Sequence, residues 1–83
     1  MYLYILYSSK VDKYYIGVSE NPNERLLKHN TKHRGFTSIA NDWQIKYSEF
    51  FSTKTEALKR EKEIKSWKSR KLLEAMINSA KRT

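Results

Sequence analysis

Glu61 is the carboxylate whose place in the sequence most suggests chemistry. The chain from Thr55 onward repeats apolar residues with a helical period, and on such a helix Glu61 falls about 40° from Ala57, inside the apolar stripe. A carboxylate on the buried side of a helix is costly unless it is paired with a cation or bound to a metal ion. Glu61 is therefore a candidate metal ligand. The alternatives are an ion pair with a nearby Arg or Lys, or a place at the edge of the stripe.

Arg25 and His29 form a second pair of interest, four residues apart in a shorter helical segment. Side chains at this spacing lie on the same side of a helix, and two that can both carry positive charge repel each other mildly. An anion such as a phosphate would be bound favourably between them. An ordinary exposed helix face is the alternative explanation.

Gly17, one of two glycines in the chain, falls inside a predicted strand, where a glycine costs stability. Because strand side chains alternate between the faces of a sheet, Gly17 shares a face with Tyr15. The missing side chain would leave a gap beside the tyrosine ring, through which a ligand could approach the backbone. A bulge or a packing requirement would explain the glycine equally well.

The segment 31–42 combines cations, an aromatic ring and a hydroxyl, a set that suits contacts to phosphates and bases. Many surface loops have a similar composition, so this feature is weak alone. We expect nucleic-acid contacts from part of this loop and from three cations further along the chain. These residues are Lys32, His33, Arg34, Thr37, Lys65, Lys68 and Arg70.

The charge balance also favours a polyanionic partner. Seventeen Lys and Arg against nine Asp and Glu give a net charge of +8. The segment 54–83 holds ten basic and four acidic residues, and so carries +6 of this charge. A field of this sign attracts nucleic acid. The alternative is a Lys-rich helix that serves solubility alone.

Length and composition restrict the remaining possibilities. Eighty-three residues predict a single domain, residues 1–83, that buries about 60% of its unfolded surface. The absence of cysteine excludes disulfides and thiolate metal sites, and is compatible with the cytoplasm, where we expect the protein. No apolar run approaches the ~20 residues of a membrane span, and the N-terminus lacks the features of a signal peptide.

The elements that would position these residues begin with two strands. Residues 2–7 and 14–18 are rich in aromatic and β-branched residues and predict a hairpin. Asn21 and Pro22 predict the start of a helix that runs to Asn30. We expect its two leucines, Leu26 and Leu27, to turn inward.

Residues 43–51 predict a third strand, and the helical pattern from Thr55 has a possible break at 66–69. Four apolar residues of this strand are expected on one face, namely Trp43, Ile45, Tyr47 and Phe51. The order β-β-α-loop-β-α-α predicts an α+β fold, a small three-stranded antiparallel sheet flanked by helices.

Taken together, these residues resemble the GIY-YIG nuclease family, in particular its small single-domain bacterial branch, which is related to the nuclease domain of the excision-repair endonuclease. The second half of the family signature is present as Tyr15-Ile16-Gly17. The first half corresponds to Tyr2-Leu3-Tyr4, of which only the last tyrosine matches. The family's helical arginine and later glutamate fall on Arg25 and Glu61, and His29 matches a position often occupied by histidine. The resemblance covers nearly the whole chain.

The resemblance implies a metal-dependent DNA endonuclease that hydrolyses phosphodiester bonds with structure-selective or weakly sequence-specific action. Glu61 would hold one divalent cation, Mg²⁺ or Mn²⁺, together with substrate oxygens and waters. Tyr4 would act as the general base, with its pKa lowered by the metal and by Arg25. Tyr15 would hydrogen-bond the phosphate or the attacking water.

In the same reading Arg25 would bind the scissile phosphate, His29 would assist or donate a proton, and Gly17 would give the DNA backbone room. Some relatives add an asparagine near the end of the domain, for which Asn78 is a loose positional candidate. The expected partner is DNA, branched or damaged.

Two other classes of function stay open. A non-catalytic nucleic-acid-binding module would keep the fold without turnover, and the incomplete first half-motif is compatible with it. A protein-interaction domain would use the basic helix to bind an acidic partner. Monomer and homodimer also stay open, because one active site cuts two strands only by pairing or by two binding events.

Overall fold

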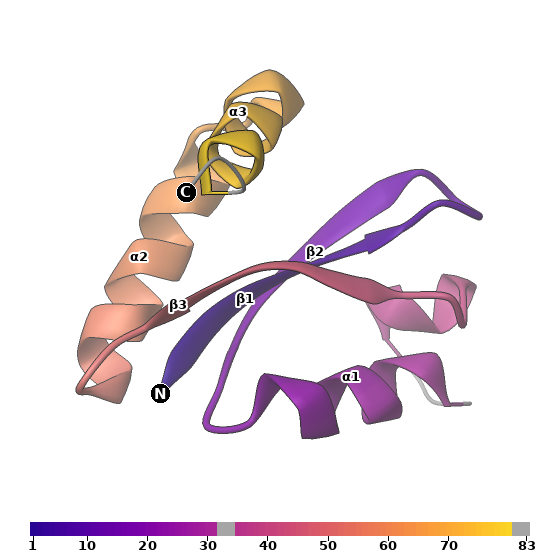
Figure 1. The fold of residues 1–83 in the computed structure, drawn as a ribbon, viewed down its shortest axis with the longest axis horizontal. Coiled ribbons are helices and arrows are strands. Elements are labelled where there is room, and N and C mark those ends of the chain that lie inside the picture. The colour runs from indigo at the N-terminus through magenta and orange to yellow at the C-terminus, as the bar shows by residue number, and fades with distance from the viewer. Residues whose placement is uncertain (32–34, 81–83) are drawn as a thin grey trace.

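Three antiparallel strands form the centre of the structure, a computed structural model that describes residues 1–31 and 35–80. Strand β1 (Tyr2–Ser8) lies between β2 (Lys13–Ser19) and β3 (Gln44–Phe50), so that β2 and β3 are the two edges of the sheet (Figure 1). This arrangement confirms the predicted hairpin, the third strand and the α+β class.

In the part of the chain that the structure describes, three helices and one short 3-10 helix surround the sheet. They are α1 (Pro22–Asn30), η1 (Phe36–Ile39), α2 (Lys54–Ser66) and α3 (Arg70–Ala80). Asn21 caps α1 as predicted, since its side chain accepts a hydrogen bond from the backbone N–H of Glu24. The predicted break is confirmed at Lys68, which has a left-handed φ of 49°. No helix within 1–31 and 35–80 is long and apolar enough to cross a membrane.

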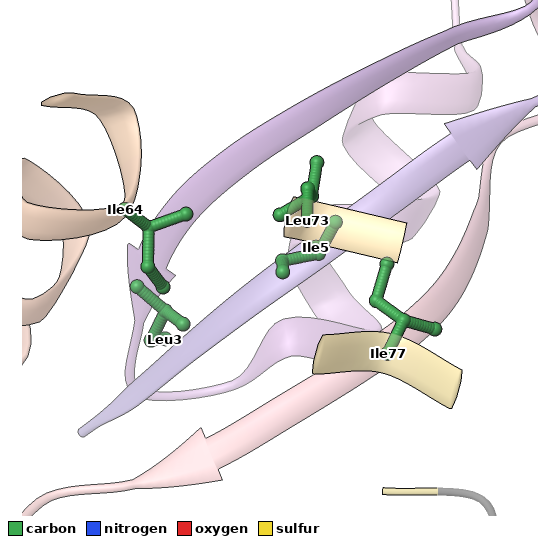
Figure 2. Packing of buried hydrophobic residues seen from close by; sticks show 5 residues of the cluster. All are labelled: Leu3, Ile5, Ile64, Leu73 and Ile77. Atoms are coloured by element: carbon green, nitrogen blue, oxygen red, sulfur yellow. The ribbon is translucent and has the colours of Figure 1, made fainter. Parts of the chain in front are cut away.

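The two faces of β1 bury different clusters of apolar side chains. On one face, Leu3 and Ile5 pack against Ile64 of α2 and against Leu73 and Ile77 of α3 (Figure 2). On the opposite face lie the side chains that pack beneath α1 and η1, which are Tyr4, Leu6, Leu26, Ala40, Trp43 and Ile45. The sheet is thus covered on both sides, with α1 on one side and α2 and α3 on the other (Figure 1).

The predicted facing of the third strand is wrong for half of its apolar residues. The pairing of β1 with β3 shifts register, so that Ile5 lies opposite Tyr47 but Leu6 lies opposite Ile45. The extra residue forms a bulge and reverses the alternation of side chains. The four residues are therefore divided, with Tyr47 and Phe51 toward α2 and α3, and Trp43 and Ile45 toward α1.

Leu27 also differs from its prediction, because 68% of its surface is exposed. Helical spacing places Leu26 and His29, three residues apart, on the face of α1 that meets the sheet. Leu27 lies about 100° further round the helix and points to solvent.

A polar network joins the β1–β2 turn to α3. Arg70 Nη2 lies 2.5 Å from Asp12 Oδ1, and its Nε lies 3.4 Å from a carboxylate oxygen of Glu74. Tyr7 donates to Asp12 at 2.5 Å and Tyr14 donates to Glu74 at 2.9 Å. The Arg70 guanidinium also lies over both tyrosine rings. The Arg70 guanidinium thus pairs with two carboxylates of the fold while its side chain stays 46% exposed, and the contact with nucleic acid expected for it stays a prediction.

This network predicts a loss of stability in acid. The hydrogen bonds from Arg70 and Tyr7 lower the pKa of Asp12 from 3.8 to about 2. A carboxyl with a lower pKa in the folded state stabilises the fold above its unfolded pKa, and this contribution is lost as the pH falls through the folded pKa. Urea unfolding of the wild type and of Asp12→Asn is measured between pH 7 and pH 2. The variant should have a lower urea midpoint than the wild type at neutral pH, and its midpoint should fall less between about pH 4 and pH 2. If the variant loses stability in acid to the same degree as the wild type, Asp12 is not a source of the acid sensitivity.

Candidate active site at the edge of the sheet

Tyr4 and Gly17 are direct partners in the pairing of β1 with β2. A Cβ atom at position 17 would lie 2.6 Å from the Tyr4 hydroxyl oxygen and 3.0 Å from a ring carbon of Tyr15. The gap expected beside Tyr15 is therefore filled by the Tyr4 phenol, and the expectation of open space for a ligand there is wrong. Gly17 is needed so that the two tyrosine rings can lie over the strand.

Gly17→Ala should displace Tyr4 and destabilise the fold by about 1–3 kcal/mol, the usual cost of overpacking a core. The measurement is urea unfolding of four proteins in a double-mutant cycle, in which Gly17→Ala is made with Tyr4 present and in the Tyr4→Ala background. The cost should be clearly smaller when the tyrosine has been removed. Equal costs in the two backgrounds would show that contact with Tyr4 is not the reason for the glycine.

His29 of α1 completes an aromatic cluster with the two tyrosines. Its Nε2 lies 3.0 Å from the Tyr4 hydroxyl, and its ring centroid lies 4.8 Å from that of Tyr15. The Tyr4 and Tyr15 centroids are 6.3 Å apart. Only 7% of the His29 surface is exposed. Three residues singled out in the sequence therefore come together in space, although His29 is buried rather than on an exposed helix face.

Thr37 supplies the contact to the other nitrogen of the His29 ring. Its Oγ1 lies 2.7 Å from Nδ1, and only 3% of the residue surface is exposed. The expectation that Thr37 contacts nucleic acid from a surface loop is contradicted by this burial. The His29–Thr37 contact could not be read from the sequence, because no helical or strand period relates a loop residue to a histidine eight positions earlier.

Arg25 and Glu61 both act electrostatically on Tyr4. Burial raises the pKa of the Tyr4 phenol above its ordinary value of 10.0, the Arg25 guanidinium beside the hydroxyl lowers it in part, and the charge of Glu61 raises it slightly. In the protein without a metal ion, desolvation outweighs the effect of the cation on the Tyr4 pKa. The lowering expected from the metal and Arg25 together stays a prediction. Arg25 and Glu61 thus both influence the charge state of the Tyr4 phenol, although they lie on different helices.

Glu61 lies at the edge of the buried stripe of α2, as one of the alternatives predicted. Its side chain is 20% exposed, and a carboxylate oxygen lies 3.3 Å from Lys65 Nζ. Within residues 1–31 and 35–80, no three His, Asp or Glu side chains cluster in a way that could hold a metal ion. A half-buried single carboxylate fits a Mg²⁺ or Mn²⁺ ion that keeps several waters and takes oxygens from a substrate.

Two hollows flank this cluster along the edge strand β2. One, of about 440 Å³, is lined by Tyr15, Lys65 and Lys68 over an apolar floor that includes Ile64. The other, of about 480 Å³, is lined by residues at the end of β2, the start of α1 and the start of α2. They are Met1, Val18, Ser19, Glu20, Asn21, Glu24, Arg25 and Lys54. A chain-like anion lying along β2 would pass both hollows and Tyr15, which lines the first of them.

Three of the predicted DNA contacts, Lys32, His33 and Arg34, lie outside the residues that the structure describes. Asn78 is exposed on α3. The edge-strand site is therefore built from α1, β1, β2 and α2, with η1 behind it.

A small α+β domain with tyrosines on two paired strands, together with an arginine and a histidine of the first helix and a glutamate of a later one, has the features of a GIY-YIG domain. The GIY-YIG catalytic domain family matches residues 1–74, and the chain belongs to this family.

Relatives of the chain include UPF0213 proteins of staphylococci. The chain is 40% identical over 73 residues to one of Staphylococcus saprophyticus, covering 87% of this chain and 88% of the relative. It is 43% identical over 54 residues to one of Staphylococcus epidermidis, covering 64% and 66%. With one of Staphylococcus aureus, the identity is 38% over 60 residues, covering 71% and 73%. No solved structure matches the chain significantly.

Proposed function

We propose that this protein is a divalent-metal-dependent DNA endonuclease that hydrolyses phosphodiester bonds. Membership of the GIY-YIG family implies a nuclease domain and a nucleic-acid substrate. The observation that carries the finer proposal is the aromatic cluster of Tyr4, Tyr15 and His29, in which Arg25 and Glu61 act electrostatically on the Tyr4 phenol.

Hydrolysis joins a water oxygen to the phosphorus atom and breaks the bond to the leaving sugar oxygen. Tyr4 takes a proton from the attacking water as its own phenolic proton passes to His29, and the leaving oxygen takes a proton from solvent. Arg25 is exposed on α1 and binds the non-bridging oxygens, where its charge stabilises the transition state. Tyr15, half-buried on β2, orients the phosphate or the water with its hydroxyl.

Glu61 is the residue of this chain that would hold the metal ion. When bound there, the ion would supply Lewis-acid stabilisation of the negative charge that develops on the phosphate. Lys65 pairs with the same carboxylate at 3.3 Å, but its side chain is largely exposed. Such an exposed pair contributes little to stability, so Lys65 can turn away toward a DNA phosphate.

The DNA contacts that we propose follow the edge strand. Lys65 and Lys68 line one hollow beside Tyr15, and Arg25 and Lys54 line the other. The loop cations Lys32, His33 and Arg34 are proposed as further contacts from the sequence alone. Binding through phosphates predicts that the affinity falls with salt, with a logarithmic slope of about −0.9 per phosphate neutralised.

The proposal is tested with labelled linear duplexes, four-way junctions and flaps, each incubated with Mg²⁺, with Mn²⁺ and with EDTA. Cleavage of at least one substrate that EDTA abolishes is the expected result, and faster cleavage of junctions or flaps would show structure selectivity. Salt-dependent binding without cleavage of any substrate would instead favour a non-catalytic binding module, which the pairing of Glu61 with Lys65 and the incomplete half-motif Tyr2-Leu3-Tyr4 make the second candidate.

A further inference from the structure

We propose that Thr37 is a positioning residue that stabilises the Nδ1–H tautomer of His29 by accepting its hydrogen bond, and thereby supports the hydrogen bond from Tyr4 to Nε2. Thr37 Oγ1 and the Tyr4 hydroxyl lie on opposite sides of the same imidazole ring, at 2.7 Å from Nδ1 and 3.0 Å from Nε2. A neutral imidazole carries one N–H, so the partner of one nitrogen decides what the other can accept.

The direction of these two hydrogen bonds follows from the neighbours of Tyr4. The raised pKa keeps the phenol protonated at neutral pH, so that the hydroxyl has a hydrogen to donate. Arg25 beside it can only donate, whereas an unprotonated Nε2 can accept. Tyr4 therefore donates to Nε2, and the ring hydrogen lies on Nδ1, from which it is donated to Thr37 Oγ1.

The surroundings of Thr37 hold it in place for this task. The ring N–H of Trp43 donates to the Thr37 backbone carbonyl at 2.9 Å, and Asn30 bonds the backbone of Trp43 at both its N–H and its carbonyl. Because Trp43 and Asn30 bond backbone and not the threonine hydroxyl, a change of the hydroxyl alone leaves these contacts intact. The bond from Trp43 therefore holds the Thr37 backbone in place, and the Thr37 hydroxyl lies against His29 Nδ1.

A consequence for catalysis rests on the proposed function. As Tyr4 takes a proton from the attacking water, its own proton passes to Nε2, and the ring becomes a cation that keeps its Nδ1–H bond to Thr37. This transfer removes the need for a free phenolate, which burial of Tyr4 disfavours. With the opposite tautomer, Nε2 would carry a hydrogen and could not receive one.

The direct test reads the tautomer by ¹⁵N NMR of the His29 ring in the wild-type protein, in Thr37→Val and in Thr37→Ser. We expect the Nδ1–H form in the wild type and in Thr37→Ser, and a shift toward Nε2–H in Thr37→Val, which has nearly the same shape but no hydroxyl. An Nε2–H ring in the wild type would overturn the proposal, whether or not the valine variant folds. So would an unchanged tautomer in Thr37→Val.

Cleavage kinetics give the second readout. Thr37→Val should lower the rate of cleavage at saturating DNA by about 10–100-fold, the usual effect of losing a partner that orients a histidine. Its DNA affinity should not change, since Thr37 is buried, and Thr37→Ser should restore the rate. A wild-type protein with the Nδ1–H tautomer and no cleavage would contradict the proposed function and leave the tautomer assignment standing. Equal cleavage by Thr37→Val would overturn the catalytic consequence.

Discussion

Glu61→Gln is expected to lower metal-dependent cleavage at least a hundredfold while DNA binding stays close to that of the wild type. The amide has nearly the shape of the carboxylate but lacks the charge that holds a divalent cation. A bound metal ion contributes several kcal/mol to the stabilisation of the transition state, and about 1.4 kcal/mol corresponds to a tenfold change in rate. The measurements are the initial rate of cleavage in Mg²⁺ and Mn²⁺, and the affinity for a labelled duplex without metal.

The matched control for this variant is Glu63→Gln. Glu63 lies on the same helix, is exposed and pairs with Arg60, and its replacement changes the net charge by the same amount. It should therefore cleave DNA at nearly the wild-type rate. A Glu61→Gln protein that cuts as fast as the wild type, or a Glu63→Gln protein that loses cleavage to the same degree, would rule out a specific role for Glu61.

Trp43→Ala should have the largest effect on stability, a loss of about 3–5 kcal/mol. The indole is buried beneath α1 and η1, and its N–H satisfies the carbonyl of Thr37. Removing it creates a cavity and leaves a buried acceptor without this donor. A loss of this size is a large part of the total free energy of unfolding of a small domain. Urea unfolding followed by circular dichroism measures the change in the free energy of unfolding.

Leu72→Ala provides the comparison for this variant, because Leu72 is a large apolar residue that is exposed on α3. Its free energy of unfolding should stay within about 0.5 kcal/mol of the wild-type value. Similar losses in the two variants would mean that Trp43 does not anchor the core on the α1 side. Since Trp43 also holds the segment that carries Thr37, the alanine variant should lose the preferred His29 tautomer at conditions where it remains folded.

Local patterns were sufficient to predict the order of the elements and most of their ends. Asn21 and Pro22 mark the start of α1 by capping geometry, which depends only on neighbouring residues. The bulge in β3 could not be predicted, because a single extra residue leaves the alternating pattern of the sequence unchanged while it reverses the facing of Tyr47. Leu27 was wrongly predicted to turn inward, because adjacent residues of a helix point about 100° apart and only Leu26 of the two faces the sheet.

Features of the site that depend on neighbouring residues could be predicted from the sequence, whereas features that depend on burial in the folded chain could not. Tyr15 and Gly17 lie within one short strand, and their shared face follows from alternation alone. The sign of the Tyr4 pKa shift depends on the balance between desolvation and the charge of Arg25, which exists only in the folded chain. The contact of Thr37 with His29 likewise depends on the path of the loop after α1.

The most direct test of the central claim is the conversion of supercoiled plasmid by wild-type protein and by Glu61→Gln, purified in the same way. Each is incubated with Mg²⁺, with Mn²⁺ and with EDTA. Metal-dependent phosphodiester hydrolysis at this site predicts nicked plasmid from the wild type with either metal, and intact plasmid with EDTA or with the variant. Intact plasmid from the wild type in both metals, or nicking that is equal in EDTA or in Glu61→Gln, would contradict it.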